Sequence, residues 1–476
     1  MRARQPDPLP SLNEEITRGV IGGAMFKLRS VSSAIRAFGH WRKSAVRRFS
    51  GRPGIRPWCV GILFVAALQS TAAFAEDVIV KRHVTVREAP DRHSDVVKFP
   101  AIGEALTLLD DGARTRGYYH IRSSDGRIGW VYHTFVTRPE QLATAPAFAS
   151  GDVAIAHFID MDQGNATLLE FPCGAILIDA GGRNAAAGDH LIAFLEAFFS
   201  RRSDLNRHLA AIFVTHTHID HNRALKRVAE TFNVDGYVHN GILFGSGRAN
   251  AAWMADFVRT HSPTIPSAAV DDGVLATAGT NGLAGPVVDP LSCPRVDPDI
   301  RVLSGGYRDN PGWPDGEFDN GNNHSLVIRV TYGRSKFLFT GDLEEPAIET
   351  LLAKYQGSQL LDIDVWEVGH HGSANGTTPA LLAAMSPQIA VISMGSSTIH
   401  APWTAWAYGH PRRTVVTMIA QTIGRARATP AEVLVADRVK HFTPFLLTKA
   451  IYGTGWNGDI DIRALPDGTL TVQTSR

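Results

Sequence analysis

A cluster of metal-binding side chains directly after an apolar segment most restricts how this chain can fold. Residues 209–214 form a short apolar run, and His216, His218, Asp220 and His221 follow it. Such a run is typical of a buried β-strand, and side chains two apart on an extended chain project to the same side. Three histidines and an aspartate would be costly to bury without a partner. Because imidazole and carboxylate groups bind divalent ions, the segment predicts a metal site at a strand end.

Further metal-capable side chains adjoin apolar segments later in the chain. The candidates, each at one end of a predicted strand, are His324, Asp342, His370 and His371. Each of them is ordinary when taken alone. Together they repeat the arrangement at residues 209–221, which predicts that several buried strands present metal ligands at one edge of a sheet.

The region 152–476 alternates predicted strands with amphipathic helices. Residues 175–178 form a predicted strand, and apolar residues at helical spacing predict a helix over 191–199. A further helix is expected over 222–230. Residues 262–323 are rich in Gly, Pro and Asn. A segment of this length is long for a loop, which predicts an insertion bordering the site.

The order of these motifs resembles the metallo-β-lactamase superfamily, which carries HxHxDH followed by His, Asp and His. Within it, the resemblance is closest to the extracytoplasmic hydrolase domain of the competence protein ComEC. Segments with that family's pattern occur at 158–166, 177–181, 322–327, 340–342, 370–373, 408–411 and 451–460. The resemblance implies an α+β fold, an αββα sandwich over 152–476. ComEC relatives often carry Asn where His324 stands, and a histidine there would favour a fuller metal site.

The resemblance also implies two divalent metal ions, with zinc expected and manganese or iron as alternatives. The ligands of the first ion would be His216, His218 and His324. Those of the second would be Asp220, His221 and one of His370 or His371, with Asp342 bridging the two ions. The choice between His370 and His371 stays open.

The implied mechanism is hydrolysis by a metal-activated hydroxide. Two such ions lower the pKa of a bound water and polarise the scissile carbonyl or phosphoryl oxygen. Asp220 is expected to orient the nucleophile as well as bind metal. His410 is expected to contact substrate or protonate the leaving group, the alternative being that it orders its loop. Asp160, Asp162 and Asp179 are candidate acceptors behind the ligating histidines, and Asp162 and Asp179 are equally well interpreted as turn residues.

Residues 78–138 form a separate strand-rich segment. Its motifs at 84–90, 103–109 and 125–131 resemble the bacterial SH3 domain, which implies a small all-β SH3-like barrel that binds cell-wall peptide or another protein. Trp130 and Tyr119 would line a ligand groove or fill the barrel core. The surface is the expected place for His83, His93, His120 and His133. The Ala- and Pro-rich residues 139–151 are a predicted linker.

The first 75 residues have the features of a secretory signal peptide. They hold 12 basic and 3 acidic residues, a net charge of +9, and an apolar run over 58–68 precedes Ala73-Phe74-Ala75. That run is short for a membrane span, although an uncleaved anchor is the alternative. We therefore expect no stable membrane span after cleavage and a periplasmic or secreted location.

Cys173 and Cys293 lie beyond this segment. They could pair in an oxidising compartment. Their spacing is not a metal signature, and two separate buried thiols are the expectation.

These observations favour an exported, dinuclear metal-dependent hydrolase of a phosphodiester, a related ester or another small molecule. The residues after 75 carry 35 basic and 43 acidic side chains, a net charge of −8, which argues against long nucleic acid as the substrate. The first alternative is hydrolysis of a lactone or lactam by the same ligands. The second is a binding protein with a vestigial metal site.

Overall fold

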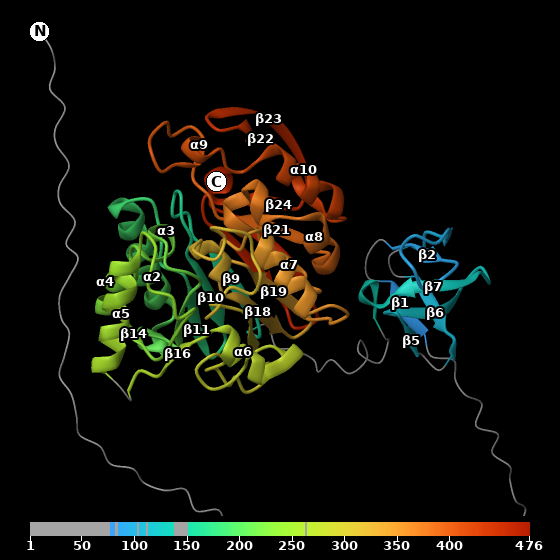
Figure 1. Ribbon diagram of the computed structural model, residues 1–476, viewed down its shortest axis with the longest axis horizontal. Coiled ribbons are helices and arrows are strands. Elements are labelled where there is room, and N and C mark those ends of the chain that lie inside the picture. The colour runs from blue at the N-terminus through green and yellow to red at the C-terminus, as the bar shows by residue number, and fades with distance from the viewer. Residues whose placement is uncertain (1–76, 81–83, 102–103, 111–112, 138–150, 262–263) are drawn as a thin grey trace, which may run out of the picture. The chain divides into compact units, whose positions relative to one another are not determined.

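The computed structural model describes residues 77–80, 84–101, 104–110, 113–137, 151–261 and 264–476. The predicted signal segment 1–75, His83 and residues 139–150 of the predicted linker lie outside these ranges. Two bodies are described, an all-β unit within 77–137 and a larger α+β domain from residue 151 onward (Figure 1). Each is considered by itself.

The all-β unit is built from short strands around a small apolar core. The strands are β1 (Asp77–Val80), β2 (Val86–Arg87), β3 (Val96–Lys98), β4 (Ala105–Leu108), β5 (Arg114–Thr115), β6 (Tyr118–Ser123), β7 (Ile128–Tyr132) and β8 (Val136–Thr137). Their order is β3-β2-β7-β6-β4-β1-β8, with β5 paired to β6. Alternating apolar residues of these strands, such as Val78, Val80 and Ile121, fill the core.

Two aromatic positions of this unit lie at the edge of its core. Tyr119 packs against the core, and Trp130 stacks on His120 with ring centroids 4.5 Å apart. The expectation that His133 lies at the surface was wrong. Its side chain is buried after β7, and Nδ1 lies 2.6 Å from the carbonyl oxygen of Gly117.

The larger domain begins with a mixed sheet of eight strands. They are β9 (Ala154–Phe158), β10 (Thr167–Phe171), β11 (Gly174–Ile178), β13 (Ala211–Val214), β15 (Tyr237–His239), β16 (Ser267–Ala269), β25 (Ile460–Ala464) and β26 (Leu470–Thr474). The order is β16-β15-β13-β11-β10-β9-β25-β26. Strands β11, β13, β15 and β16 run parallel to one another, so their carboxyl ends share one edge.

A second sheet of six strands faces the first. Its strands are β17 (Asp299–Ser304), β18 (Val327–Tyr332), β19 (Ser335–Phe339), β20 (Val365–Glu367), β21 (Ile389–Ile392) and β24 (Ile451–Gly453), paired in that order. Strands β19, β20, β21 and β24 are parallel. The rings of Phe158 and Phe339 stack between the two sheets, with centroids 6.2 Å apart.

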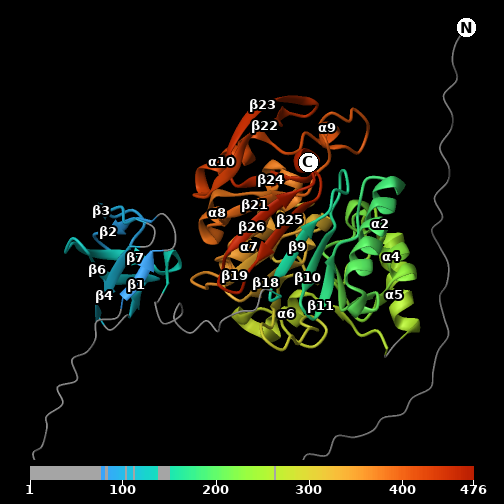
Figure 2. The same ribbon diagram turned by 180° about the vertical axis from the view of Figure 1, so that it is seen from behind.

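Helices cover the sheets on their outer sides. Helices α2 (Ala185–Arg201), α4 (Leu225–Thr231) and α5 (Arg248–Thr260) pack on the first sheet, and α7 (Glu345–Lys354), α8 (Pro379–Met385) and α10 (Arg413–Thr422) lie against the second (Figures 1 and 2). Alternation along β11 explains the layering: Ile176 and Ile178 enter the core between the sheets, whereas Ala175 and Leu177 pack under helices. The predicted αββα sandwich is confirmed.

Two predicted segments differ in detail from the structure. The helix expected over 222–230 is interrupted, so that α3 (Ile219–Asn222) carries ligand candidates and α4 follows it. Residues 264–323 are not one long loop, because β16, α6 (Asp272–Ala278) and β17 lie within them. Strand β17 pairs with β18, which makes this segment part of the second sheet. Among the described residues, no helix has the length and apolar character needed to cross a membrane.

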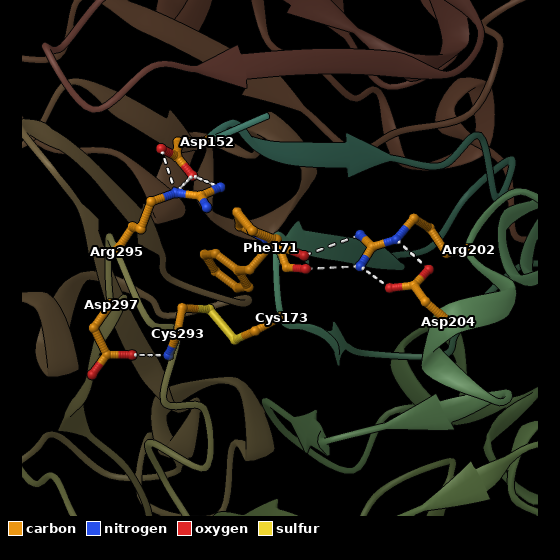
Figure 3. The surroundings of a disulfide bond; sticks show 9 residues. Asp152, Phe171, Cys173, Arg202, Asp204, Cys293, Arg295 and Asp297 are labelled. Carbon is orange, nitrogen blue, oxygen red and sulfur yellow. Dashed lines mark hydrogen bonds and ion pairs between the residues drawn. A yellow bond between two sulfur atoms is a disulfide. The ribbon is translucent and has the colours of Figure 1, made fainter. Parts of the chain in front are cut away.

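A disulfide bond joins Cys173 to Cys293, so the expectation of two separate thiols was wrong (Figure 3). The two Cα atoms lie 5.3 Å apart although 120 positions separate the residues in sequence. The sequence could not reveal this proximity, because it arises only when the segment before β17 returns to the β10–β11 hairpin. Hydrogen bonds fix the segments that carry the two cysteines. Arg202 donates to the carbonyl of Phe171, and Asp297 accepts from the backbone N–H of Cys293.

A buried carboxyl links the two sheets beneath the metal-binding candidates. Glu367, at the end of β20, accepts hydrogen bonds from Thr167 on β10 at 3.1 Å and from Ser393 at 2.8 Å. Asn165 donates to the other carboxyl oxygen at 3.3 Å. Burial, with a smaller contribution from the charge of Asp179, raises the pKa of Glu367 to about 7.

Reduction of the disulfide is expected to destabilise the larger domain. Opening a loop of this length should lower the free energy of unfolding by about 2–4 kcal/mol. Denaturant unfolding with and without reductant measures the change. A Cys173→Ser/Cys293→Ser double variant is the control, since reductant should leave its stability unchanged. Alkylation of both thiols in the native, unreduced protein would contradict the bond.

The raised pKa of Glu367 should make stability fall as the pH rises. Below pH 4.5 the Glu367 carboxyl is protonated in both the folded and the unfolded chain. Between pH 4.5 and 7 this carboxyl ionises readily only in the unfolded chain. Between pH 4.5 and 7, the free energy of unfolding of the chelator-treated Glu367→Gln variant should therefore rise by about 3 kcal/mol relative to that of the wild type. Exposed Glu349→Gln is the matched control. Parallel pH profiles for wild type and Glu367→Gln would disprove the assignment.

Candidate metal centre

The ends of parallel strands from both sheets bring the candidate ligands together. His216 follows β13 in the first sheet. In the second sheet Asp342 follows β19, and His371 follows β20. Because carboxyl ends of parallel strands share an edge, and the sheets face each other, residues distant in sequence meet at one place. The predicted arrangement of ligands at one rim is therefore present.

Four side chains form a compact group of potential ligand atoms. Asp220, His221, Asp342 and His371 each offer an atom, and these atoms lie within 4.8 Å of one another. His221 Nε2 is 3.2 Å from Asp342 Oδ1, and His371 Nε2 is 3.4 Å from Asp342 Oδ2. His371 Nε2 also lies 3.5 Å from Asp220 Oδ2. The structure thus gathers the expected second ligand set, with His371 rather than His370 in it.

His216 and His218 lie beside this group. His216 Nε2 is 3.9 Å from Asp342 Oδ2 and 3.1 Å from His218 Nδ1. His216 is fully buried, and its Nδ1 faces the hydroxyls of Thr215 at 3.2 Å and Ser325 at 3.4 Å. With Nδ1 engaged by hydroxyls, Nε2 is the nitrogen that faces Asp342.

Two glycines allow this close assembly. A Cβ on Gly181 would lie 1.6 Å from the carbonyl oxygen of Asp220, so only glycine permits the approach of α3. Gly341 has φ 51°, and a Cβ there would lie 2.9 Å from the side chain of Thr215. The glycines of the 177–181 and 340–342 motifs therefore set the spacing of the ligands.

The charges of the group balance one another. Burial opposes charge on every member, but Asp342 and then Asp179 hold the pKa of His221 well above its ordinary value. Asp342 and a hydrogen bond to Asp220 likewise raise the pKa of His371 to about 10. In turn, His221 and His371 hold the pKa of Asp342 well below its ordinary value, again against burial. The two imidazoles and the carboxylate of Asp342 thus favour each other's charged forms.

The remaining histidines of the site are kept neutral. Burial, followed by the charges of His221 and His218, lowers the pKa of His216 well below its ordinary value. Burial also lowers the pKa of His218. A neutral imidazole has the free lone pair that a metal ion requires.

His324 is not brought to this group, in contrast to the sequence-based expectation. Its Nε2 donates to the carbonyl of Phe318 at 2.7 Å, and its Nδ1 accepts from the backbone N–H of Tyr307 at 3.1 Å. Trp313 and Phe244 pack edge-on against the ring. Because backbone groups engage both nitrogens, His324 anchors the segment before β18 instead of facing the ligands.

His370 lies at the margin of the group. Its Nε2 is 3.9 Å from Asp342 Oδ2, and its Nδ1 is 3.2 Å from Glu344 Oε1 and 3.1 Å from Asn375 Oδ1. Both His370 and His371 have positive φ, 47° and 52°. This tight turn sends the two adjacent rings to different places, which a linear motif could not reveal.

Of the three aspartates expected behind the histidines, only Asp179 has that role. It accepts from His221 Nδ1 at 2.7 Å and from the backbone N–H and hydroxyl of Thr215 at 2.7 and 2.8 Å. Asp160 and Asp162 instead bind Arg476 and Arg183. The acceptor for His371 is a backbone carbonyl, that of Ser393 at 2.6 Å.

Sequence reasoning missed two polar residues at the site, Asn322 and Glu344. Asn322 Nδ2 donates to Glu344 Oε1 at 2.7 Å, and both residues are buried. The side-chain oxygen of Asn322 is buried without a hydrogen-bond partner. Asn322 lies two positions before His324 in the same motif, and its polarity beside an apolar strand was the available signal.

A cavity of about 400 Å³ opens onto the ligand group. Residues before the second sheet that line it include Arg183, Arg223 and Ser246. Later residues of the chain that line it include Asn322, His370, Trp403, Tyr408 and His410. Cationic and aromatic side chains therefore surround the metal-binding candidates.

His410 lines this cavity, as expected for a residue near substrate. Its ring is 7% exposed, and Nδ1 lacks a hydrogen-bond partner. Burial, followed by the charges of His370 and His371, lowers the pKa of His410 well below its ordinary value. The ring is thus neutral, and a loop-ordering role through Nδ1 has no contact to support it.

The residues present fit divalent cations. Asp220, His221, Asp342 and His371 converge with oxygen and nitrogen donors, as zinc and related ions require. His216 and His218 add neutral imidazoles, and Asn322, whose side-chain oxygen has no partner, also lines the cavity. An orphaned buried oxygen among such donors is costly without a cation or donor to satisfy it.

Comparisons with known proteins agree with this geometry. The model of the Metallo-beta-lactamase superfamily matches residues 159–396, half of the 476-residue chain. Similar curated proteins include Competence protein ComA of Neisseria gonorrhoeae, 39% identical over 97 residues, which are 20% of this chain and 12% of the relative. Recombination protein 2 of Haemophilus influenzae is 39% identical over 89 residues, 19% of this chain and 10% of the relative. The matches thus span about a tenth of the relatives' length.

Solved structures show a partial likeness. The metallo-beta-lactamase fold protein YhfI from Bacillus subtilis is 11% identical with a TM-score of 0.32, covering 57% of this chain and 93% of that one. Human tRNase Z, short form, is 12% identical with a TM-score of 0.28, covering 50% and 91%. Together the family match and the αββα fold lead to one conclusion: the chain belongs to the metallo-beta-lactamase superfamily and is a metal-dependent hydrolase.

Proposed function

We propose that this protein is an exported hydrolase that uses two divalent metal ions to cleave a phosphodiester or a related ester. The observation that carries the proposal is the position of Asp342. Its two oxygens lie 3.2 Å from His221 Nε2, 3.4 Å from His371 Nε2 and 3.9 Å from His216 Nε2. A carboxylate between two histidine sets is suited to bridge two cations.

The ligand sets that this position suggests are unequal. Asp220, His221 and His371 would hold one ion with Asp342. His216 and His218 would hold the second ion together with Asp342, and the free oxygen of Asn322 is a further group available, since His324 is bound to backbone groups. Zinc suits these donors best, although manganese and iron also accept them.

Metal ions at this site would activate water for attack and polarise the oxygen of the scissile group. The protein's own residues would position that chemistry. Asp179 fixes the ring of His221, and the carbonyl of Ser393 fixes the ring of His371. Asp220 faces the cavity and is placed to orient the attacking group. His410, neutral and facing the same cavity, would contact the substrate or its leaving group.

The charge of the cavity favours a phosphodiester over a lactone or lactam. Arg223 lines it, and its guanidinium group suits an anionic group better than a neutral ring. The net charge of −8 over the residues after 75 opposes binding of a long polyanion, so a small phosphodiester is the preferred substrate.

Export is supported by two independent features. The first 75 residues carry a predicted signal peptide, and the Cys173–Cys293 disulfide is typical of proteins in oxidising compartments. The all-β unit within 77–137 would then tether the enzyme to cell-wall peptide or another protein, as its resemblance to bacterial SH3 domains suggests.

Cell fractionation tests location and tethering together. The protein is expected outside the cytoplasm and sedimenting with cell-wall material, whereas a chain lacking residues 78–138 should be released from it. Retention of the full chain in the cytoplasm contradicts export. Equal sedimentation of both chains contradicts the tether but leaves export intact.

Loss of the bridging carboxylate is expected to remove metal and activity together. Metal analysis of the zinc-supplemented wild type should give about two ions per chain, and Asp342→Ala should bind one or none. Hydrolysis of bis(4-nitrophenyl) phosphate, measured as kcat/KM, should fall at least about 1000-fold, since activation of water depends on the ions. Chelator should abolish wild-type activity, and added zinc or manganese should restore it.

A pair of histidine variants separates ligand loss from general damage. His371→Ala should lose metal and activity, whereas His324→Gln, whose ring bonds only to backbone groups, should keep its metal stoichiometry. Thermal unfolding of both variants controls for folding. Full activity of Asp342→Ala refutes the two-metal proposal, and turnover of a lactam alone, with phosphodiesters untouched in every metal, refutes the substrate class.

A further inference from the structure

The cavity beside the ligand group is lined by two chemically different kinds of side chain. Trp403 and Tyr408, from the loop after β21 and from α9 (Ala405–Tyr408), form an aromatic wall, and Arg223 after α3 adds a cation. We propose that the substrate carries a flat aromatic group that packs on Trp403 and Tyr408, and a second anionic group that pairs with Arg223. This inference rests on the proposed phosphodiester hydrolysis and narrows its substrate to a small, doubly functional molecule.

The aromatic wall runs from solvent to the ligands. Trp403 is 71% exposed, and its ring centroid lies 6.3 Å from that of Tyr408. Tyr408 stacks on His410 at 5.6 Å with an interplanar angle of 20°, and His410 stacks on His371 at 6.4 Å and 22°. A flat ring placed on Trp403 or Tyr408 would therefore continue a series of rings that leads to a metal-ligand candidate.

The backbone conformation of Trp403 is also unfavourable. The residue has φ 61°, in the left-handed region that a bulky side chain rarely adopts. Backbone strain of this kind clusters at ligand-binding sites, and Trp403 lines the cavity. Packing of a substrate ring would remove its apolar face from water.

The helix that presents this wall is fixed by the neighbouring ribbon of β22 (Ala426–Arg438) and β23 (His441–Lys449). The backbone N–H of Lys440 donates to the carbonyl of Trp406 at 3.1 Å, and the ammonium of Lys440 lies 5.3 Å from the Trp406 ring centroid. Trp406 itself stacks on His400 at 4.7 Å. Trp406 thus holds the helix, and Trp403 remains free to contact a ligand.

Arg223 lines the same cavity and supplies a cation there. Its Nε donates to the carbonyl of Gly182 at 2.7 Å, which orients the guanidinium. Within the described ranges, no ion pair joins Arg223 to a carboxylate, whereas Arg183 pairs with Asp162, and Arg227 with Asp189. The remaining N–H groups of Arg223 match the oxygens of a phosphate or carboxylate.

The acidic residues of the cavity do not cancel this charge. Asp220 and Asp342 are engaged with His221 and His371, and would hold metal ions in the active enzyme. An anionic substituent can thus approach Arg223 while the scissile phosphodiester lies at the ligand group. The substrate must fit a cavity of about 400 Å³, which limits it to a small molecule.

Three esters with one leaving group test the two contacts separately. They are methyl 4-nitrophenyl phosphate, 4-nitrophenyl thymidine 5′-phosphate, which adds a flat ring, and the 3′-phosphorylated form of the latter, which adds a dianion. In the wild type KM should fall about tenfold at each step. Trp403→Ala should abolish the first step, and Arg223→Gln the second. Trp403→Phe should restore most of the first step.

Matched controls come from residues outside the cavity. Leu446→Ala removes an exposed apolar side chain of β23, and Arg227→Gln removes an arginine four positions after Arg223 that is already paired with Asp189. Both control variants should show the same two decreases in KM along the ester series as the wild type. If Trp403→Ala and Arg223→Gln behave like their controls, the substrate contacts proposed here are wrong even though hydrolysis itself stands.

A binding measurement decides the inference without turnover. Calorimetry with thymidine 3′,5′-bisphosphate should give at least about tenfold tighter binding than with methyl phosphate, lost in Trp403→Ala and weakened in Arg223→Gln. Equal affinities for both ligands in the wild type overturn the inference. Absence of hydrolysis of all three esters with every metal, combined with the expected binding pattern, refutes the proposed reaction and leaves the two contacts in place.

Discussion

The buried Asp342 carboxylate is the charge around which the other side chains of the site are arranged. It is 4% exposed, and a carboxylate in such a place is stable only with positive partners close to it. His221 and His371 approach it from opposite sheets. The need to balance this one charge therefore ties together strand ends that are more than 100 residues apart in sequence.

The sandwich supports that arrangement through polar contacts between its sheets. Asn165 donates to both Asp179 and Glu367, so the acceptor behind His221 and the buried glutamate share one amide. Glu367 also accepts from Ser393, whose carbonyl receives the N–H of His371. The orientation of both histidine rings thus depends on a hydrogen-bonded layer that lies below the cavity and touches no substrate.

Local sequence patterns predicted the parts of this fold that depend on short segments. The apolar runs before His216 and Asp342 and the helix over 191–199 were visible because strand and helix periodicity are local properties. The αββα order was implied by the resemblance of the motifs to the superfamily. Asp179 was one of three candidate acceptors behind the ligating histidines, with a turn residue as the alternative. Motif order was sufficient here because parallel strands deliver their following residues to a common edge.

The predictions that failed depended on side-chain direction or on contacts distant in sequence. His324 has the right residue type at the right place in the motif, but its ring turns to backbone carbonyl and amide groups. His370 and His371 could not be separated because a positive φ at both residues sends their rings apart. The Cys173–Cys293 pair depended on a return of the chain over 120 positions, which no local pattern records.

The ribbon of β22 and β23 has a consequence for how such an enzyme can diversify. It belongs to neither sheet of the sandwich, yet it fixes α9 through Trp406 and Lys440. The residues that position the ligand candidates and the residues that position the aromatic wall therefore belong to separate structural elements. Substitutions in the ribbon can accumulate, and move Trp403 and Tyr408, while the buried charges that maintain the fold stay unchanged.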